Sequence, residues 1–137
     1  MADLITNNEI QAAVVGWLKS KPLIVVEVID SEEIKGDQWQ GTAFVYPAIR
    51  VRLISNRPEG RQGCVQPLTL GIQVYTEDAS PKNCDRIAGI IGKEIHDNQF
   101  SASGFHFGMF VTDLVPAYRR DAQTWMAEVL VKADVQG

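Results

Sequence analysis

The 137-residue sequence contains few of the residues that build metal centres and nucleophilic sites. Its cysteines are Cys64 and Cys84, and its histidines are His96 and His106. Two cysteines placed this far apart form neither a disulfide framework nor the paired spacing of a zinc site. We therefore expect reduced thiols, no metal and no cofactor.

Several sequence signals of other protein classes are missing as well. The phosphate-binding fingerprints GxGxxG and GxxxxGK with a following Ser or Thr do not occur. No apolar run reaches 18 residues, the length of a membrane-spanning helix, and the first ten residues lack the features of a signal peptide. The net charge of −4 gives no support to general nucleic-acid binding. We expect a protein made in the cytoplasm that has no membrane partner.

The composition that remains is that of an ordinary globular protein. Hydrophobic residues make up 45% of the chain and charged residues 22%, which is typical of a folded domain with a real core. No linker, repeat or low-complexity segment divides the chain. The length suits a single domain over residues 1–137.

The clearest periodic stretch runs from residue 80 to residue 100. Ser80 suits an N-cap, and Pro81 suits the first helical position, where its missing N–H costs nothing. An apolar stripe follows at four-residue spacing, formed by Ile87, Ile91 and Ile95. This pattern predicts an amphipathic helix whose stripe must be covered by a sheet.

The N-terminal part predicts another helix. Residues 6–9 match a capping box, with Ile5 and Ile10 placed as a hydrophobic staple. Apolar residues at helical spacing then predict a helix over residues 7–19, which Pro22 ends. Residues 23–29 are rich in β-branched side chains and are interpreted as a strand.

Two hairpins complete the predicted fold. Residues 43–55 and 66–77 alternate in polarity and flank a polar loop, and the strand beginning at Phe105 and the one over residues 125–135 alternate in the same way. The predicted class is α+β, a mostly antiparallel sheet of two hairpins with two helices packed on it, in the order α-(β)-β-β-α-β-β. We expect the isoleucine stripe to pack on the sheet face that carries Leu70, Ile72, Val129 and Val131.

Charge is separated along the first half of the chain. Residues 27–37 hold five acids and one base, and residues 50–61 hold four arginines and one acid. The interpretations left open are a solvated hairpin face, pairing within the chain, a contact between subunits, and contact with nucleic-acid phosphate. Trp39 lies in a polar stretch and is interpreted as an interface anchor. The candidate interface or lumen residues are Arg50, Arg52, Arg57, Arg61, Glu32, Glu33 and Trp39.

A resemblance to a known family is carried by four stretches. They are VYPAIRVRL at residues 45–53, LGIQVYT at residues 70–76, DRIAGIIGKEIH at residues 85–96, and the closing hairpin over residues 105–135 with RRD at its turn. Together, in their size and order, they resemble the tail terminator or tail completion proteins of long-tailed bacteriophages, which are similar to minor tail protein U.

The resemblance implies a structural protein and not an enzyme, because the family has no catalytic motif to carry across. It implies a ring of identical subunits, usually six, that caps the finished tail tube. The implied partners are other copies of the chain, the tail tube protein and the head-completion protein. DNA would pass through the lumen without specific binding. The implied location is the tail or neck of a virion, after synthesis in the host cytoplasm.

Two alternatives stay open. Within the same class, the chain could be another neck or tail protein, such as a head-closure or tail-tube protein. From a different class, it could be a small α+β enzyme or ligand-binding domain that uses His96, His106 and Asp113. A ring-sized assembly would favour the structural interpretation, whereas a monomer with a deep polar pocket would favour the enzyme.

Overall fold

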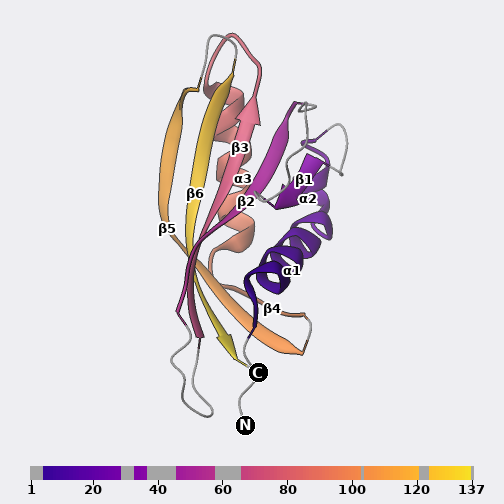
Figure 1. Cartoon of the computed structure of the whole chain (residues 1–137). Coiled ribbons are helices and arrows are strands. Elements are labelled where there is room, and N and C mark those ends of the chain that lie inside the picture. Colours follow the sequence, from indigo (N-terminus) through magenta and orange to yellow (C-terminus); the bar gives the residue numbers. More distant parts are fainter. Residues whose placement is uncertain are drawn as a thin grey trace.

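The computed structural model describes residues 5–28, 33–36, 46–57, 66–102, 104–120 and 124–136 (Figure 1). The helices in this part of the chain are α1 (Asn7–Lys19), α2 (Pro22–Val25) and α3 (Lys82–Ile95). The strands are β1 (Ile34–Gly36), β2 (Ala48–Asn56), β3 (Gln66–Thr76), β4 (Asn98–Ala102), β5 (Phe105–Arg119) and β6 (Trp125–Gln136). The predicted α+β class is confirmed.

The six strands form one sheet in the order β1-β2-β3-β6-β5-β4. Every neighbouring pair is antiparallel except β1 with β2, which is parallel. Both predicted hairpins, β2 with β3 and β5 with β6, are confirmed. Figure 1 shows a strongly twisted sheet, with α3 packed against its long central strands and α1 beside β1 and β2.

Helix α1 has the predicted start and end. The backbone N–H of Glu9 donates to Thr6 Oγ1 at 3.3 Å, and the backbone N–H of Thr6 donates to Glu9 Oε1 at 3.1 Å, which forms the expected capping box. Ile5 and Ile10 are both fully buried, as the hydrophobic staple requires.

The interpretation of residues 23–29 as a strand is wrong. Pro22 opens the short helix α2, in which the backbone N–H groups of Val25 and Val26 donate to the carbonyls of Lys21 and Pro22. Proline fixes φ near the helical value, so it ends α1 but also begins the next turn. In α2, Ile24 is fully buried and Val25 packs against the core while partly buried. Leu23 and the C-cap residue Val26 are exposed. The strand expected before the first hairpin is instead β1.

The long helix is shorter at both ends than the sequence indicated. Pro81 takes the N-cap position, and Ser80 Oγ accepts from the backbone N–H of Lys82 at 3.2 Å. At the other end Asp97 adopts a left-handed conformation with φ of 59°, and Asn98 Nδ2 donates to the carbonyl of Glu94. This local stop releases residues 98–102 to form β4, so the extension of the helix to residue 100 is wrong.

The isoleucine stripe lies in the core, as predicted. Ile87, Ile91 and Ile95 are at most 1% exposed and share one cluster with the inward side chains of the central strands, among them Leu70, Ile72, Val129 and Val131. Gly92 brings the helix close to the sheet, because a Cβ there would lie 3.0 Å from a methyl group of Leu114. None of the described helices is long and apolar enough to cross a membrane.

Candidate functional site

Among the candidate interface residues that the structure describes, three lie on β2 or just beyond its end, and Glu33 directly precedes β1. Arg50 and Arg52 alternate with the buried residues Ile49 and Val51, and therefore point to the sheet face opposite the helices. Arg57 follows the strand and is exposed. The other candidates Arg61, Glu32 and Trp39 lie outside the described residues.

Arg50 is held inside its own chain. Its side chain is only 3% exposed, and its Nη2 donates to Glu33 Oε1 at 3.0 Å. Its Nη1 also donates to the backbone carbonyls of Glu33 and Ile49. The acidic segment thus returns to the sheet at β1, and the intrachain pairing that the sequence left open is formed by this arginine.

Arg52 forms a second ion pair, which crosses the neighbouring strand. Its guanidinium donates to both carboxylate oxygens of Glu128 on β6, with Nε–Oε2 at 3.1 Å and Nη2–Oε1 at 3.0 Å. Gly71 of β3 lies between the two strands, and a Cβ at that position would collide with the Glu128 carboxylate. A glycine inside an alternating strand is the signal that could have revealed this close approach.

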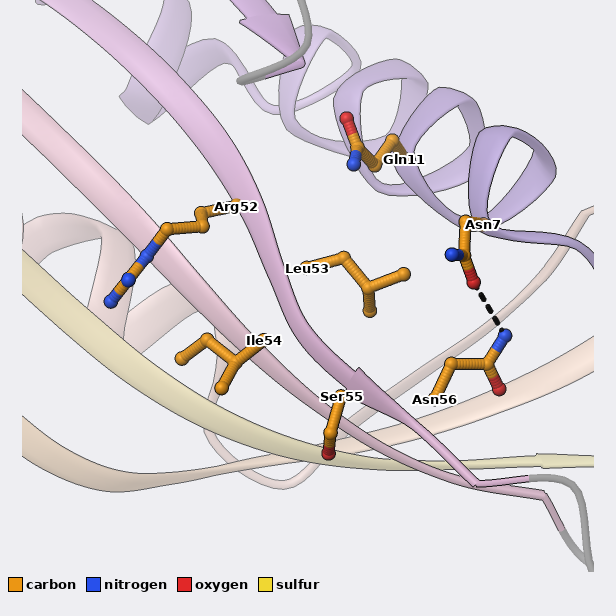
Figure 2. A pocket seen from close by; sticks show the side chains of 7 residues that line it. All are labelled: Asn7, Gln11, Arg52, Leu53, Ile54, Ser55 and Asn56. Atoms are coloured by element: carbon orange, nitrogen blue, oxygen red, sulfur yellow. Dashed lines mark hydrogen bonds between the residues drawn. The ribbon is translucent and has the colours of Figure 1, made fainter.

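A groove of about 300 Å³ separates α1 from the second half of β2 (Figure 2). Leu53 points toward the helix, Arg52 points away from it, and Asn56 Nδ2 donates to Asn7 Oδ1 at 2.8 Å at one end. Gln11 lines the same groove, and its buried Oε1 has no hydrogen-bond donor among the described residues. That oxygen would lie 2.5 Å from a Cβ at Gly36, where β1 ends.

A second groove, of about 430 Å³, lies between α1 and β4. Its wall is aromatic, because the ring of Trp17 stacks on Phe100 with centroids 5.6 Å apart, and Phe100 stacks on Phe107 at 4.7 Å. The helix contributes mostly small residues to this groove. Trp17 is therefore a core residue, which also positions β4.

The candidate catalytic residues are not brought together. His96 lies at the end of α3, where its Nδ1 accepts from the backbone N–H of Val111 at 3.1 Å. His106 contacts Ser101 and Gln99 of β4. Asp113 is on the same strand as His106, seven residues further along and so roughly 20 Å away. Within the described ranges, no three His, Cys, Asp or Glu side chains are grouped to hold a metal ion.

Two titrating groups have clear structural causes for their shifts. The pKa of Glu27 is lowered because its carboxylate accepts two hydrogen bonds from the Arg86 guanidinium, at 2.7 and 3.0 Å. Burial raises the pKa of the Cys84 thiol, which donates to the carbonyl of Val74. The Glu27–Arg86 pair ties α3 to the end of α2. The Cys84 thiol is a buried core group and not a reactive nucleophile.

Comparison with known proteins finds similarity in fold alone. No family model matches the sequence, and no curated protein matches it. A solved chain described as "Virion of native gene transfer agent (GTA) particle" is similar, with a TM-score of 0.72 and 15% identity over 98% of this chain and 100% of that chain. A second solved structure has a TM-score of 0.63 and 11% identity over 98% of each chain. Both likenesses span this chain from end to end.

Proposed function

We propose that the protein is a structural component of a phage-like virion, and more specifically a tail terminator. In this proposal identical subunits, six in number, form a ring that ends the tail tube and offers the head its joining surface. The observation that carries the proposal is the fold likeness to a gene transfer agent virion chain, which covers 98% of this chain and all of the other. The order of elements matches the resemblance drawn from the sequence.

The placement of the polar residues supports a role without catalysis. His106 and Asp113 are separated along one strand, and His96 binds a backbone N–H with the ring nitrogen that a general base would need. The two grooves described above are lined by amide, aliphatic and aromatic groups, by serine hydroxyls and by a single arginine, without a histidine or a carboxylate among the lining residues. Such surfaces suit protein contacts better than acid–base chemistry.

Two arginines of the arginine-rich region are poorly placed to bind DNA. Arg50 and Arg52 each face a carboxylate of their own chain, which neutralises them as phosphate ligands. We place Arg57, Arg61, Glu32 and Trp39 at the subunit interface, with Arg50, Arg52 and Glu33 supporting that surface from within. The proposed partners are further copies of the chain, the tail tube protein and the head-completion protein, in the neck of the virion.

Deletion of the gene from the particle that carries it, followed by electron microscopy, tests this function. A terminator mutant should assemble full heads and separate tails of irregular length, because nothing ends tube growth. Complementation with the intact gene should restore joined tails of uniform length. Uniform but unjoined tails would instead identify a head-closure protein, absent tails a tube protein, and normal particles would overturn the proposal.

A further inference from the structure

The side chain of His96 completes a row of the sheet that its own backbone does not enter. Strand β4 begins at Asn98, which is paired with Met109 of β5. Two further steps of this antiparallel register place residue 96 opposite Val111. The backbone N–H of Val111 donates to Nδ1 of the His96 ring at 3.1 Å, so the ring takes the place of a strand carbonyl.

The backbone around His96 explains why a side chain is used at this position. The backbone N–H of His96 donates to the carbonyl of Gly92 at 2.9 Å, so this residue still caps α3. Asp97 follows with a φ of 59°, and β4 begins only after it. His96 therefore joins two elements, because its backbone belongs to the end of the helix and its ring binds the edge of β5.

The contact with Val111 requires a neutral imidazole. A neutral ring has one nitrogen that accepts a hydrogen bond, whereas both nitrogens of an imidazolium carry protons. A protonated Nδ1 would face the Val111 N–H as a second donor, and the hydrogen bond would be lost. The His96 side chain is 53% exposed, so a proton from solvent reaches the ring without any unfolding.

The protonated ring has favourable contacts of its own. Nε2 of His96 lies 3.7 Å from Oδ2 of Asp97, which would pair with an imidazolium. The carbonyl groups at the C-terminal end of α3 also favour a positive charge at this position. Protonation therefore exchanges the contact with the sheet for contacts within the helix end.

Other charged groups near this end of α3 are few. Lys93 and Glu94 share the last turn of the helix with His96. The titratable residues of β5 are His106, Asp113, Tyr118 and Arg119, and none of them has a hydrogen bond or ion pair with His96. Helix α2 and strand β4 contain no charged residue, and the side chains of β3 and β6 that pack on α3 are apolar. Asp97 is therefore the ion-pair partner of the imidazolium among the described residues.

We infer that His96 is a pH-sensitive clasp between α3 and β5. The neutral ring holds the edge of β5 through the Val111 N–H, and the protonated ring releases that N–H and pairs with Asp97. Acid thereby frees the end of the β4–β5 pairing while the sheet stays folded. The inference goes beyond the proposed function, because the clasp lies within a single copy of the chain.

A second contact between the same two elements provides an internal control. At the start of α3, Oδ1 of Asp85 accepts from the backbone N–H of Ala117 at 2.7 Å. Aspartate side chains titrate at lower pH than imidazoles, whose charge changes between about pH 5 and pH 8. The Asp85 contact should therefore stay closed over the range in which the His96 clasp opens.

Amide hydrogen exchange at single-residue resolution, measured from about pH 8 to about pH 5, tests the clasp. Comparison of each rate with the intrinsic rate at the same pH gives a protection factor. We expect the factor of Val111 to fall roughly three- to tenfold on acidification, as the loss of one hydrogen bond implies, while that of Ala117 stays constant. In His96→Gln the amide oxygen accepts at every pH, so the protection of Val111 should not depend on pH. The matched control His106→Ala should respond like the wild type, because that ring contacts side chains of β4.

Three results would overturn the clasp. The first is a protection factor of Val111 that does not change with pH, and the second is an equal fall at Val111 and Ala117, which would indicate general loosening. Both are measured on the wild-type protein, so they do not depend on the folding of a variant. The third is a fall at Val111 that persists in His96→Gln, which would assign the response to another group. None of these results bears on the proposed ring, whose test is the mass of the assembly.

Discussion

At the scale of single residues, Gly71 provides the space in which the Arg52–Glu128 ion pair crosses β3. Glu128 is only 8% exposed, so its carboxylate depends on Arg52 for charge compensation. Breaking a buried pair by displacing one partner is costly, because the remaining charge is left without its partner. A side chain at position 71 would therefore lower stability by disturbing the Arg52–Glu128 pair more than by changing the packing.

We expect Gly71→Ala to destabilise the fold by about 1–3 kcal/mol, measured by urea unfolding. The matched control is Gly108→Ala on β5, where a Cβ would meet nothing within 4 Å, and it should change stability by less than about 0.5 kcal/mol. In a Glu128→Ala background the cost of Gly71→Ala should largely disappear. An equal cost in both backgrounds would show that the ion pair is not the cause.

The Glu27–Arg86 pair gives a pH dependence with a defined sign. Because the hydrogen bonds from Arg86 lower the folded-state pKa of Glu27 below its ordinary 4.5, the folded state binds this proton less readily than the unfolded chain does. The contribution to stability is therefore fully present above about pH 4.5 and is lost as the pH falls through the folded-state pKa. Arg86→Gln should lower stability at pH 7 and flatten its decline below pH 4.5. A decline as steep as that of the wild type in urea titrations would contradict this assignment.

At the scale of secondary-structure elements, α3 owes its place to one stripe of isoleucines on the sheet. Ile91 is fully buried in the core cluster that also contains Ile72 and Val129 of the sheet, so its loss leaves a cavity. We expect Ile91→Ala to lower the free energy of unfolding by about 2–5 kcal/mol. The exposed Lys93→Ala on the same helix is the control and should be close to neutral. An unchanged melting temperature for Ile91→Ala would mean that the helix does not depend on this contact.

The elements that the sequence predicted well are those set by a long, regular pattern. Helix α1 has its predicted bounds because the capping box at Thr6 and the apolar spacing agree. Both hairpins follow from long stretches of alternation, although each contains a register shift. Residues 23–25 and 98–102 were misassigned because a single local feature decides each of them. Pro22 starts a helical turn within a β-branched run, and Asp97 ends α3 one turn early.

The candidate site was predictable only in part, for a related reason. The alternation of β2 sets Arg50 and Arg52 apart from the buried Ile49 and Val51, but it gives no information about the partners of the two arginines. Glu33 is 17 residues before Arg50 and Glu128 is 76 residues after Arg52, so only the strand order brings them together.

At the scale of the whole molecule, charge reversal tests how subunits meet. We expect Arg57→Glu with Arg61→Glu to abolish oligomers in size-exclusion light scattering, and Glu32→Lys to restore them in part. Lys132→Glu, an exposed position on β6, is the control and should assemble normally. If the double arginine variant assembles but particles lose infectivity, the arginines face the lumen and contact DNA. If assembly and infectivity both survive, they form a solvated surface.

The mass of the purified protein in solution tests the central claim most directly. Native mass spectrometry, with end-on electron microscopy of the same sample, should find a closed symmetric ring at six times the 15.2 kDa subunit mass. A chain that ends a tail tube must present such a ring to both the tube and the head. A single 15.2 kDa species at every concentration from micromolar to millimolar would contradict the claim.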